Sequence, residues 1–281
     1  ANVAAGQPYP CLDHLGRRSR GAFDTPAEMA RRLVRDAISA ADGSVRTGLD
    51  SACGTGTFLL ALHEAGVPEV FGTDLDELAL RVAEIAIPRA RLLVQDALLP
   101  GPKMDVVVGN PPFVPPERQD KALRLELRRR FPWLRGRFDL VVPFAATAAE
   151  RARKGGSVGL VLPAPFTVQP YGAVLRRRWV SRHRLTELSG PHPFPGAAVD
   201  VMLVVMQVDV GPGVLPAFGM GHEELLRLEN VPLNPSLMPG DVEIVEEIRR
   251  ASVPLGSLCV VDTGLVAHGP QGGKGRLLHG Q

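Results

Sequence analysis

The stretch "LDSACGTGTF", residues Leu49 to Phe58, joins the end of an apolar strand to the start of a helix through a glycine-rich turn. Gly54 and Gly56 allow the backbone of the turn to approach a ligand, and the Asp50 carboxylate can accept hydrogen bonds from a cationic amine. Similar turns occur in NAD-binding enzymes and in tight corners that bind nothing, so the turn alone leaves the function open. It does predict a strand, a turn and a helix of an α/β fold.

Apolar strands and helical patterns alternate around this turn, from about residue 26 to about residue 208. Strands are predicted over 46–50, 69–74, 90–97, 104–110, 157–163, 184–190 and 198–208. Helices are predicted between them, beginning with 25–40, where Thr25 is the expected cap and Pro26 the first helical residue. A later helix is expected from an Asp139 cap to a stop at Gly155. This alternation is typical of βαβ units.

Acidic residues follow three successive predicted strands, as Asp50, Asp74 and Asp96. An acid about 20 residues after a glycine turn is where Rossmann-like folds bind ribose hydroxyls, which favours that role for Asp74. Asp96 can accept a hydrogen bond from an adenine amino group. Each acid alone could be a helix cap, but three on one edge of a sheet favour a ligand site. Because the turn lacks the third glycine of a phosphate cradle, the expected ligand is cationic and without phosphates, as S-adenosylmethionine is.

A second feature is the stretch "DVVVGNPPFVPP", residues Asp105 to Pro116, in which a buried strand ends in an amide, two prolines and an aromatic ring. The Asn110 side-chain oxygen and the Pro111 carbonyl oxygen are two acceptors on a stiff backbone, able to bind both hydrogens of a conjugated amine. Such bonds would direct the nitrogen lone pair toward a sulfonium methyl. Phe113 offers a face on which a planar group can stack.

These motifs resemble the adenine-N6 DNA methyltransferases of restriction–modification systems, in their gamma motif order, over roughly residues 17–210. "GAFDTP" (Gly21 to Pro26), "DSACGTGTF", "GTDLD", "QDA", "GNPPF" and "HPFPGAAVDVMLVVMQ" occur in the family's order. The resemblance implies catalysis by Asn110, Pro111, Pro112 and Phe113, and stacking of a flipped adenine between Phe113 and Phe194. It implies S-adenosylmethionine binding by Phe23, Thr25, Pro26, Asp50, Ala52, Gly54, Gly56, Asp74, Leu75, Asp96, Ala97 and Asn110.

The resemblance also implies the fold and the domain plan. The fold class is a Rossmann-like, class I S-adenosylmethionine-dependent methyltransferase: a seven-stranded, mainly parallel sheet with one antiparallel strand and helices on both faces. Residues 1–42 would form a helical segment carrying the cofactor-lining motif, and 43–210 the catalytic domain. Residues 211–281 would lead toward a DNA-recognition domain that is absent or truncated, or supplied by a separate subunit. We therefore expect weak DNA methylation by this chain alone.

Composition is consistent with a globular cytoplasmic protein. Of the 281 residues 45% are hydrophobic, and there is neither a long apolar run nor a charged, apolar signal peptide at the start. No membrane partner is therefore expected. The three cysteines and the seven histidines show no metal-ligand spacing, so no metal is expected either.

Basic residues are concentrated in the segment Glu117–Arg137, where they alternate with Phe131 and Trp133. This segment, taken as a loop, is a candidate for contact with double-stranded DNA, although a solvated helix face explains the charges about as well.

Other enzymes share parts of the pattern. RNA guanine-N2 and release-factor glutamine methyltransferases also have Asn-Pro-Pro, but they lack a segment like "GAFDTP". A non-catalytic assembly subunit is disfavoured because every catalytic position is present. Pro10-Cys11 is similar to the nucleophile of cytosine-C5 methyltransferases, but it precedes the cofactor turn instead of following it, so a structural cysteine is favoured.

Overall fold

A computed structural model describes residues 24–195, 199–213, 221–234, 236–237, 240–253 and 257 of the chain. The chain forms two compact units that divide after Val242. The first unit holds the sheet and all helices up to α9. The second, from Glu243, contains most of helix α10 (Asp241–Ala251).

The centre of the first unit is one seven-stranded sheet in the order β3-β2-β1-β4-β5-β7-β6. The strands are β1 (Thr47–Asp50), β2 (Glu69–Asp74), β3 (Arg91–Val94), β4 (Met104–Gly109), β5 (Ala152–Pro163), β6 (Arg184–His192) and β7 (Val201–Gln207). Strands β1 to β5 pair in parallel, whereas β7 lies antiparallel between β5 and β6. The expected mainly parallel sheet with one antiparallel strand is confirmed.

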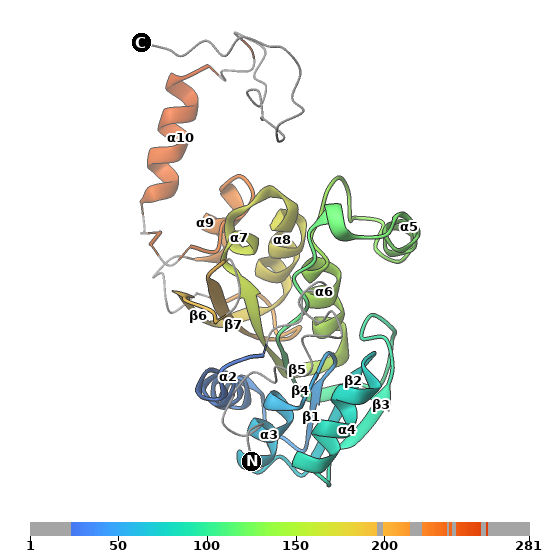
Figure 1. Cartoon of the computed structure of the whole chain (residues 1–281). Helices are drawn as coiled ribbons and strands as arrows, with labels where there is room; N and C mark the ends of the chain where they lie inside the picture. The colour runs from blue at the N-terminus through green and yellow to red at the C-terminus, as the bar shows by residue number, and fades with distance from the viewer. Residues whose placement is uncertain are drawn as a thin grey trace. The chain divides into compact units, whose positions relative to one another are not determined.

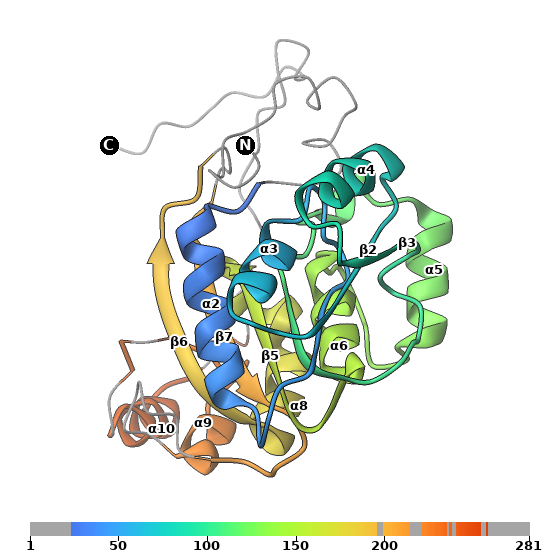
Figure 2. The same cartoon turned by 90° about the horizontal axis from the view of Figure 1, so that it is seen from below.

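Helices cover both faces of the sheet, as Figure 1 shows with α2, α3 and α4 below it and α6, α7 and α8 above it. They are α2 (Ala27–Ala40), α3 (Thr57–Glu64), α4 (Glu77–Ala86), α5 (Lys121–Arg130), α6 (Val141–Arg151), α7 (Ala164–Val168), α8 (Ala173–Arg182) and α9 (His222–Arg227), with short 3₁₀ turns η2 (Pro116–Arg118) and η3 (Pro170–Gly172). The turned view in Figure 2 places α2 in front of β5 and β7, and α6 and α8 behind.

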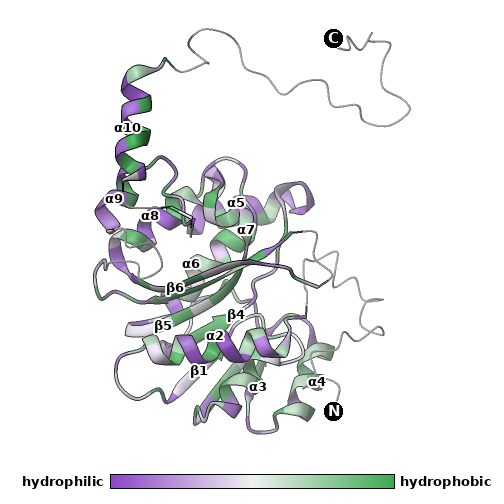
Figure 3. Ribbon diagram, turned by 90° about the vertical axis from the view of Figure 1, so that its left-hand side faces the viewer, coloured by the Kyte–Doolittle hydropathy of each residue, from purple (hydrophilic) through white to green (hydrophobic). Residues whose placement is uncertain are grey.

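Helix α2 shows how the sequence pattern produces this packing. Ala30, Leu33, Val34 and Ala37 recur at helical spacing and are fully buried, and Figure 3 shows hydrophilic and hydrophobic residues alternating along the helix. Its N-cap is Pro26, without a side-chain cap, so the expected Thr25 cap is wrong. Burial of one face, which contributes about 25 cal/mol per Å² of apolar area, stabilises the helix without a cap.

Two other expectations are corrected. Helix α6 ends at Arg151 instead of continuing to the glycine pair, because the chain enters β5 at Ala152 and Gly155 N donates to the Val208 carbonyl (2.8 Å). The basic segment after the Asn-Pro-Pro loop is not a loop throughout, since residues 121–130 form α5. Phe131, expected to face nucleic acid, is only 2% exposed and packs in the interior.

Asp105 ties β1 to β4 at the start of both strands. Its Oδ2 accepts hydrogen bonds from Arg46 N, Thr47 N and Thr47 Oγ1, at 2.8–2.9 Å, and Arg153 Nε lies 2.5 Å from Oδ1. Burial acts to raise the pKa of Asp105, but these bonds outweigh it and lower the pKa to about 2. The contacts align the two strands whose opposite ends form the site described below.

Some expectations fall outside the described residues. Phe23 is one of them, and so are Pro10 and Cys11 and almost all of the chain after residue 253. The domain boundaries at residues 42 and 210 remain predictions. Among the described residues, no helix is both long and apolar enough to cross a membrane.

Candidate functional site

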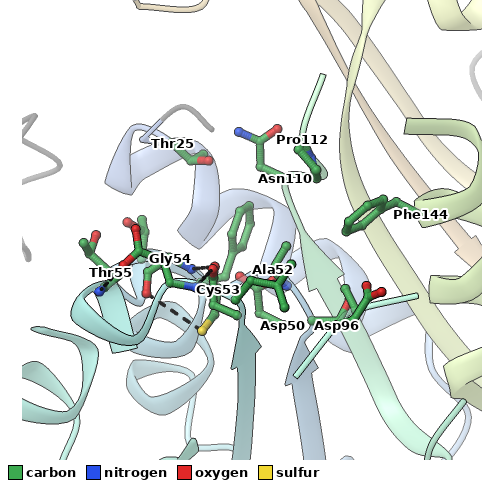
Figure 4. Close-up of a pocket in the computed structure, with 18 of the residues that line it drawn as sticks. Thr25, Asp50, Ala52, Cys53, Gly54, Thr55, Asp96, Asn110, Pro112 and Phe144 are labelled. Carbon is green, nitrogen blue, oxygen red and sulfur yellow. Dashed lines mark hydrogen bonds between the residues drawn. The ribbon is translucent and has the colours of Figure 1, made fainter. Parts of the chain in front are cut away.

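A cavity of about 350 Å³ lies at the carboxyl ends of β1 to β4. Strand order reverses between β1 and β4, and such a switch point is where open α/β sheets bind ligands. The volume is within the usual range for small-molecule sites. In Figure 4, Cys53, Gly54 and Thr55 lie to the left, Phe144 to the right, and Asn110 with Pro112 above.

The predicted cofactor residues divide into those that line this cavity and those that do not. Thr25, Asp50, Ala52, Gly54, Asp74, Leu75, Asp96, Ala97 and Asn110 line it. Pro26 and Gly56 are not among the lining residues. Gly56 is the N-cap of α3 with a φ of 95°, and a Cβ added there would lie 3.0 Å from Ile87 and 3.1 Å from Ala83. Its role in the structure is tight packing of α3 on α4.

Asp74 joins the glycine turn to the end of β2. Its Oδ2 accepts from Gly54 N (2.7 Å) and its Oδ1 accepts from Asp76 N (2.9 Å). Asp76 in turn caps α4 by accepting from Ala79 N (3.2 Å). Both Asp74 oxygens keep a lone pair available, so the carboxylate can accept further bonds from two neighbouring hydroxyl groups.

Asp96 is positioned in the same way after β3. Its Oδ1 accepts from Leu98 N (2.9 Å), which closes a local turn, and Gln95 N donates to the Asp74 carbonyl (3.1 Å). The ends of β2 and β3 are therefore linked by this main-chain bond. The three strand-end acids lie around one cavity, as expected.

Asp50 differs from the other two acids because it is almost completely buried. It is 2% exposed, and its Oδ1 accepts from Ala52 N (3.0 Å). Burial raises the pKa of Asp50 to about 8, against the lowering effect of the Ala52 bond and with a further rise from the nearby Asp74 charge. A buried carboxyl with a raised pKa in a cleft is a candidate for binding a cation.

The Asn-Pro-Pro loop forms another wall of the cavity through Asn110 and Pro112. It approaches β1 closely at Gly109, where an added Cβ would lie 2.9 Å from Asp50 Oδ1. Pro111 is buried and lines a separate small void behind the loop.

The two predicted stacking rings are not among the residues that line the cavity. Phe113 is half-buried against the hydrophobic cluster between the sheet and α2–α4, and Phe194 is 6% exposed within that cluster. Stacking on a base therefore stays a prediction for both rings, and for Phe194 it requires the ring to leave the cluster.

A network after the loop holds it against the start of α6. Asp139 Oδ1 accepts from Val141 N (2.9 Å), at the first residue of α6, and also from Val114 N (3.1 Å). The N-cap of α6 is Leu140, without a side-chain cap, so the expected Asp139 cap is wrong by one residue. The Gln119 side chain, 7% exposed, donates to the Val114 and Phe138 carbonyls, each at 2.8 Å. Burial raises the pKa of Asp139 despite these bonds. The loop is thus anchored directly after Phe113.

Several lining residues were missed from the sequence, notably Phe58, Arg118, Leu140 and Phe144. Phe144 lies on α6, in a run of apolar and small residues where only the fold shows which ring faces the cavity. Arg118 was included in the basic segment, but its position at the cavity was not foreseen. Among the described residues, no group of His, Cys, Asp and Glu could hold a metal ion.

Comparison with known proteins supports the resemblance found in the sequence. Residues 95–189 match the family described as Eco57I restriction-modification methylase. The chain is 30% identical over 202 residues to a Type II methyltransferase from Thermus thermophilus, a match covering 66% of this chain and 45% of that protein. The chain therefore spans less than half of that relative. Resemblance to restriction–modification methyltransferases is confirmed.

Solved structures show the same fold. The type IIG restriction endonuclease BpuSI matches with a TM-score of 0.54 at 16% identity, over 72% of this chain and 27% of that one. A Listeria monocytogenes protein assigned as a class I S-adenosylmethionine-dependent methyltransferase matches with a TM-score of 0.50 at 20% identity, over 73% and 69%. The class I methyltransferase fold is thereby confirmed.

Proposed function

We propose that this chain transfers a methyl group from S-adenosylmethionine to the N6 amine of adenine in DNA, after the base has left the duplex. One observation carries the proposal: the strand-end acids and the Asn-Pro-Pro loop line the same cavity. A cofactor held by the acids would therefore lie beside the amide that binds the amine. The description of the matched family as a restriction-modification methylase, together with a relative named as a Type II methyltransferase, supports DNA as the substrate.

The cavity residues fit S-adenosylmethionine. In this proposal Asp50 accepts from its ammonium group, Asp74 from its ribose hydroxyls and Asp96 from its adenine amino group. Phe144 offers an apolar face for a planar ring, and Thr25 lines the cavity with Asp24 beside it. When bound, the cofactor supplies an electrophilic methyl on a positively charged sulfur.

The chemistry assigned to this chain is activation of a weakly nucleophilic amine. The Asn110 side-chain oxygen, which lines the cavity, accepts one amine hydrogen. The Pro111 carbonyl is proposed as the second acceptor although Pro111 is not among the lining residues, and the two bonds together would shift the nitrogen toward tetrahedral geometry and free its lone pair for attack. As the nitrogen–carbon bond forms and the sulfur–carbon bond breaks, one amine proton passes to solvent. Neither a covalent intermediate nor a general base with a shifted pKa is required.

A direct test is transfer of label from methyl-tritiated S-adenosylmethionine to unmethylated DNA, to RNA and to protein, with the chain in excess over each acceptor. After digestion of the DNA to nucleosides, the label is expected in N6-methyldeoxyadenosine. Label in RNA guanine or in protein glutamine would contradict the proposal. Cofactor hydrolysis without any transfer would contradict it too.

A pH dependence of cofactor binding follows from Asp50. Its carboxyl is protonated in the free protein below about pH 8, whereas an ammonium group favours the carboxylate, so binding releases a proton. Affinity for S-adenosylmethionine should therefore rise between about pH 6 and pH 7.5, by up to about tenfold per pH unit. Over this range the amine of the ligand, with a pKa of about 7.7–8.0, stays mostly charged. Calorimetry on the parent and on Asp50→Asn tests this, because the variant should bind weakly and show no such rise. A parent affinity that is constant over this range would remove Asp50 from ammonium binding.

A further inference from the structure

Arg118 differs from the other basic residues that follow the Asn-Pro-Pro loop because its side chain lines the cavity. It lies on the 3₁₀ turn η2, is exposed, and lines the cavity. Among the described lining residues it is the one cationic side chain, with the acids Asp24, Asp50, Asp74, Asp76 and Asp96 around the same cavity. An anionic group of a ligand that forms an ion pair with a lining side chain would therefore form it with Arg118.

Most of the neighbouring cations are already engaged. Arg137 pairs with Glu117, and Arg130 pairs with Glu150 (3.6 Å). Arg124 donates to the Pro116 carbonyl (3.3 Å), and Arg128 donates to the Gly136 carbonyl (2.7 Å). Because the adjacent Glu117 is occupied by Arg137, it does not neutralise Arg118. Within the described part of the chain, the Arg118 guanidinium has no hydrogen-bond or ion-pair partner.

The backbone beneath Arg118 is held in place. Arg118 N donates to the Pro115 carbonyl (3.0 Å), and the next residue, Gln119, is clamped by its two side-chain bonds to Val114 and Phe138. The backbone of the turn is therefore already ordered. Binding of an anion by the Arg118 guanidinium would cost only the conformational entropy of that side chain.

Two anions are present in the proposed reaction, the carboxylate of the cofactor and the phosphates of the nucleic acid. The exposed cations that follow Arg118 in the sequence favour the phosphates. Lys121, Arg129 and Arg135 are exposed and, like Arg118, have no partner among the described residues. A single carboxylate would use only one cation, whereas a strand with several phosphates can use more than one, so further unpaired cations in the same segment favour the nucleic acid.

We propose that Arg118 binds a phosphate of the strand whose base enters the cavity, and so sets how far that nucleotide is inserted. This inference rests on the proposed function. The guanidinium suits the role because its planar fork can bind two phosphate oxygens at once. The contact is independent of base identity, so Arg118 positions the nucleotide without contributing to sequence recognition.

The test is the salt dependence of binding to a fluorescently labelled oligodeoxyadenylate, which needs neither base-pair opening nor a known target sequence. Each phosphate contact on a single strand contributes about 0.7 to the slope of log affinity against log salt. In Arg118→Ala the slope of log affinity against log salt should be smaller by about 0.7, and binding at 0.1 M salt should be roughly fivefold weaker than in the parent. The plots of log affinity for the parent and for the variant should meet near 1 M salt. Arg118→Lys should retain most of the slope. The control is Arg81→Ala, which removes an exposed charge on α4 that is not part of the cavity lining. Its affinity for the oligonucleotide should show the same salt dependence as that of the parent.

Other outcomes would overturn the inference in distinguishable ways. If Arg118→Ala keeps the parent slope but loses affinity for S-adenosylmethionine in calorimetry, the guanidinium binds the cofactor carboxylate instead. If Arg118→Ala keeps both the parent salt slope and the parent affinity for S-adenosylmethionine, Arg118 binds no ligand anion. If the parent itself shows no salt-dependent binding to the oligonucleotide, the proposed function fails together with the inference.

Discussion

Asn110→Ala is expected to reduce the rate of methyl transfer by roughly 10²–10³-fold, equivalent to roughly 2.7–4 kcal/mol, the size typical of one lost preorganised polar contact. The amide lines the cavity beside the acids expected to hold the cofactor, and its acceptor oxygen matters most once the amine has moved toward tetrahedral geometry. The ground-state complex gains little from that bond. Cofactor affinity should therefore be nearly unchanged while the rate falls.

The rate is best measured in a single turnover with the chain in excess over DNA, so that weak DNA binding does not limit the signal. Calorimetry with S-adenosylmethionine on the same preparation is the control for folding of the loop. If Asn110→Ala methylates adenine at the parent rate, the loop is not the amine-activating site and its sequence must be explained by structure. If rate and cofactor affinity fall together, Asn110 acts on the cofactor instead.

Asp74→Ala is expected to abolish detectable binding of S-adenosylmethionine. The substitution removes the acceptor proposed for the ribose hydroxyls, and it also releases Gly54 N and Asp76 N, the two amides that the carboxylate holds at 2.7 and 2.9 Å. Both the contact and the shape of the glycine turn are lost. Each of these buried or partly buried amides also costs free energy when it loses its acceptor.

Asp74→Asn separates these two effects. The asparagine keeps one oxygen acceptor and nearly the same shape, so it should bind the cofactor weakly but measurably. Glu77→Ala, an exposed acid three residues further on at the start of α4, should bind as the parent does. Unchanged affinity in Asp74→Ala would remove the ribose role of Asp74 and leave the fold assignment intact.

The strands that form the site were the most predictable part of the fold. The predicted strands at 69–74 and 104–110 agree with β2 and β4 to within one residue, because each contains a short apolar run and stops at a polar residue. The helix over 121–130 was less predictable. Its residues are mostly charged, with Leu127 the only one fully buried, so hydrophobic periodicity gives little signal.

Residue roles that depend on distant contacts were the least predictable. Thr25 lines the cavity although it does not cap α2, and Phe131 is buried although it lies among arginines. Three adjacent arginines on α8 have different surroundings. Arg176 is fully buried and donates to carbonyls that include Val231 O (2.9 Å), Arg177 donates to the Leu226 carbonyl (3.0 Å), and Arg178 lies 5.5 Å above the Trp133 ring. Spacing along one helix cannot show which neighbours arrive from α9 or from the segment after α5.

The sequence by itself determined the order of the seven strands and of the helices between them other than α5, the position of an acid or an amide at four strand ends, and the resemblance to restriction–modification methyltransferases. These features are local, since they depend on residues a few positions apart and on the alternation of apolar and polar side chains. Only the tertiary structure decided that Phe144 and Arg118 line the cavity, that Asp50 is buried with a raised pKa, and that Phe194 lies in the core. The physical reason is that burial, desolvation and cavity shape are set by packing between elements far apart in the chain, which no local pattern encodes.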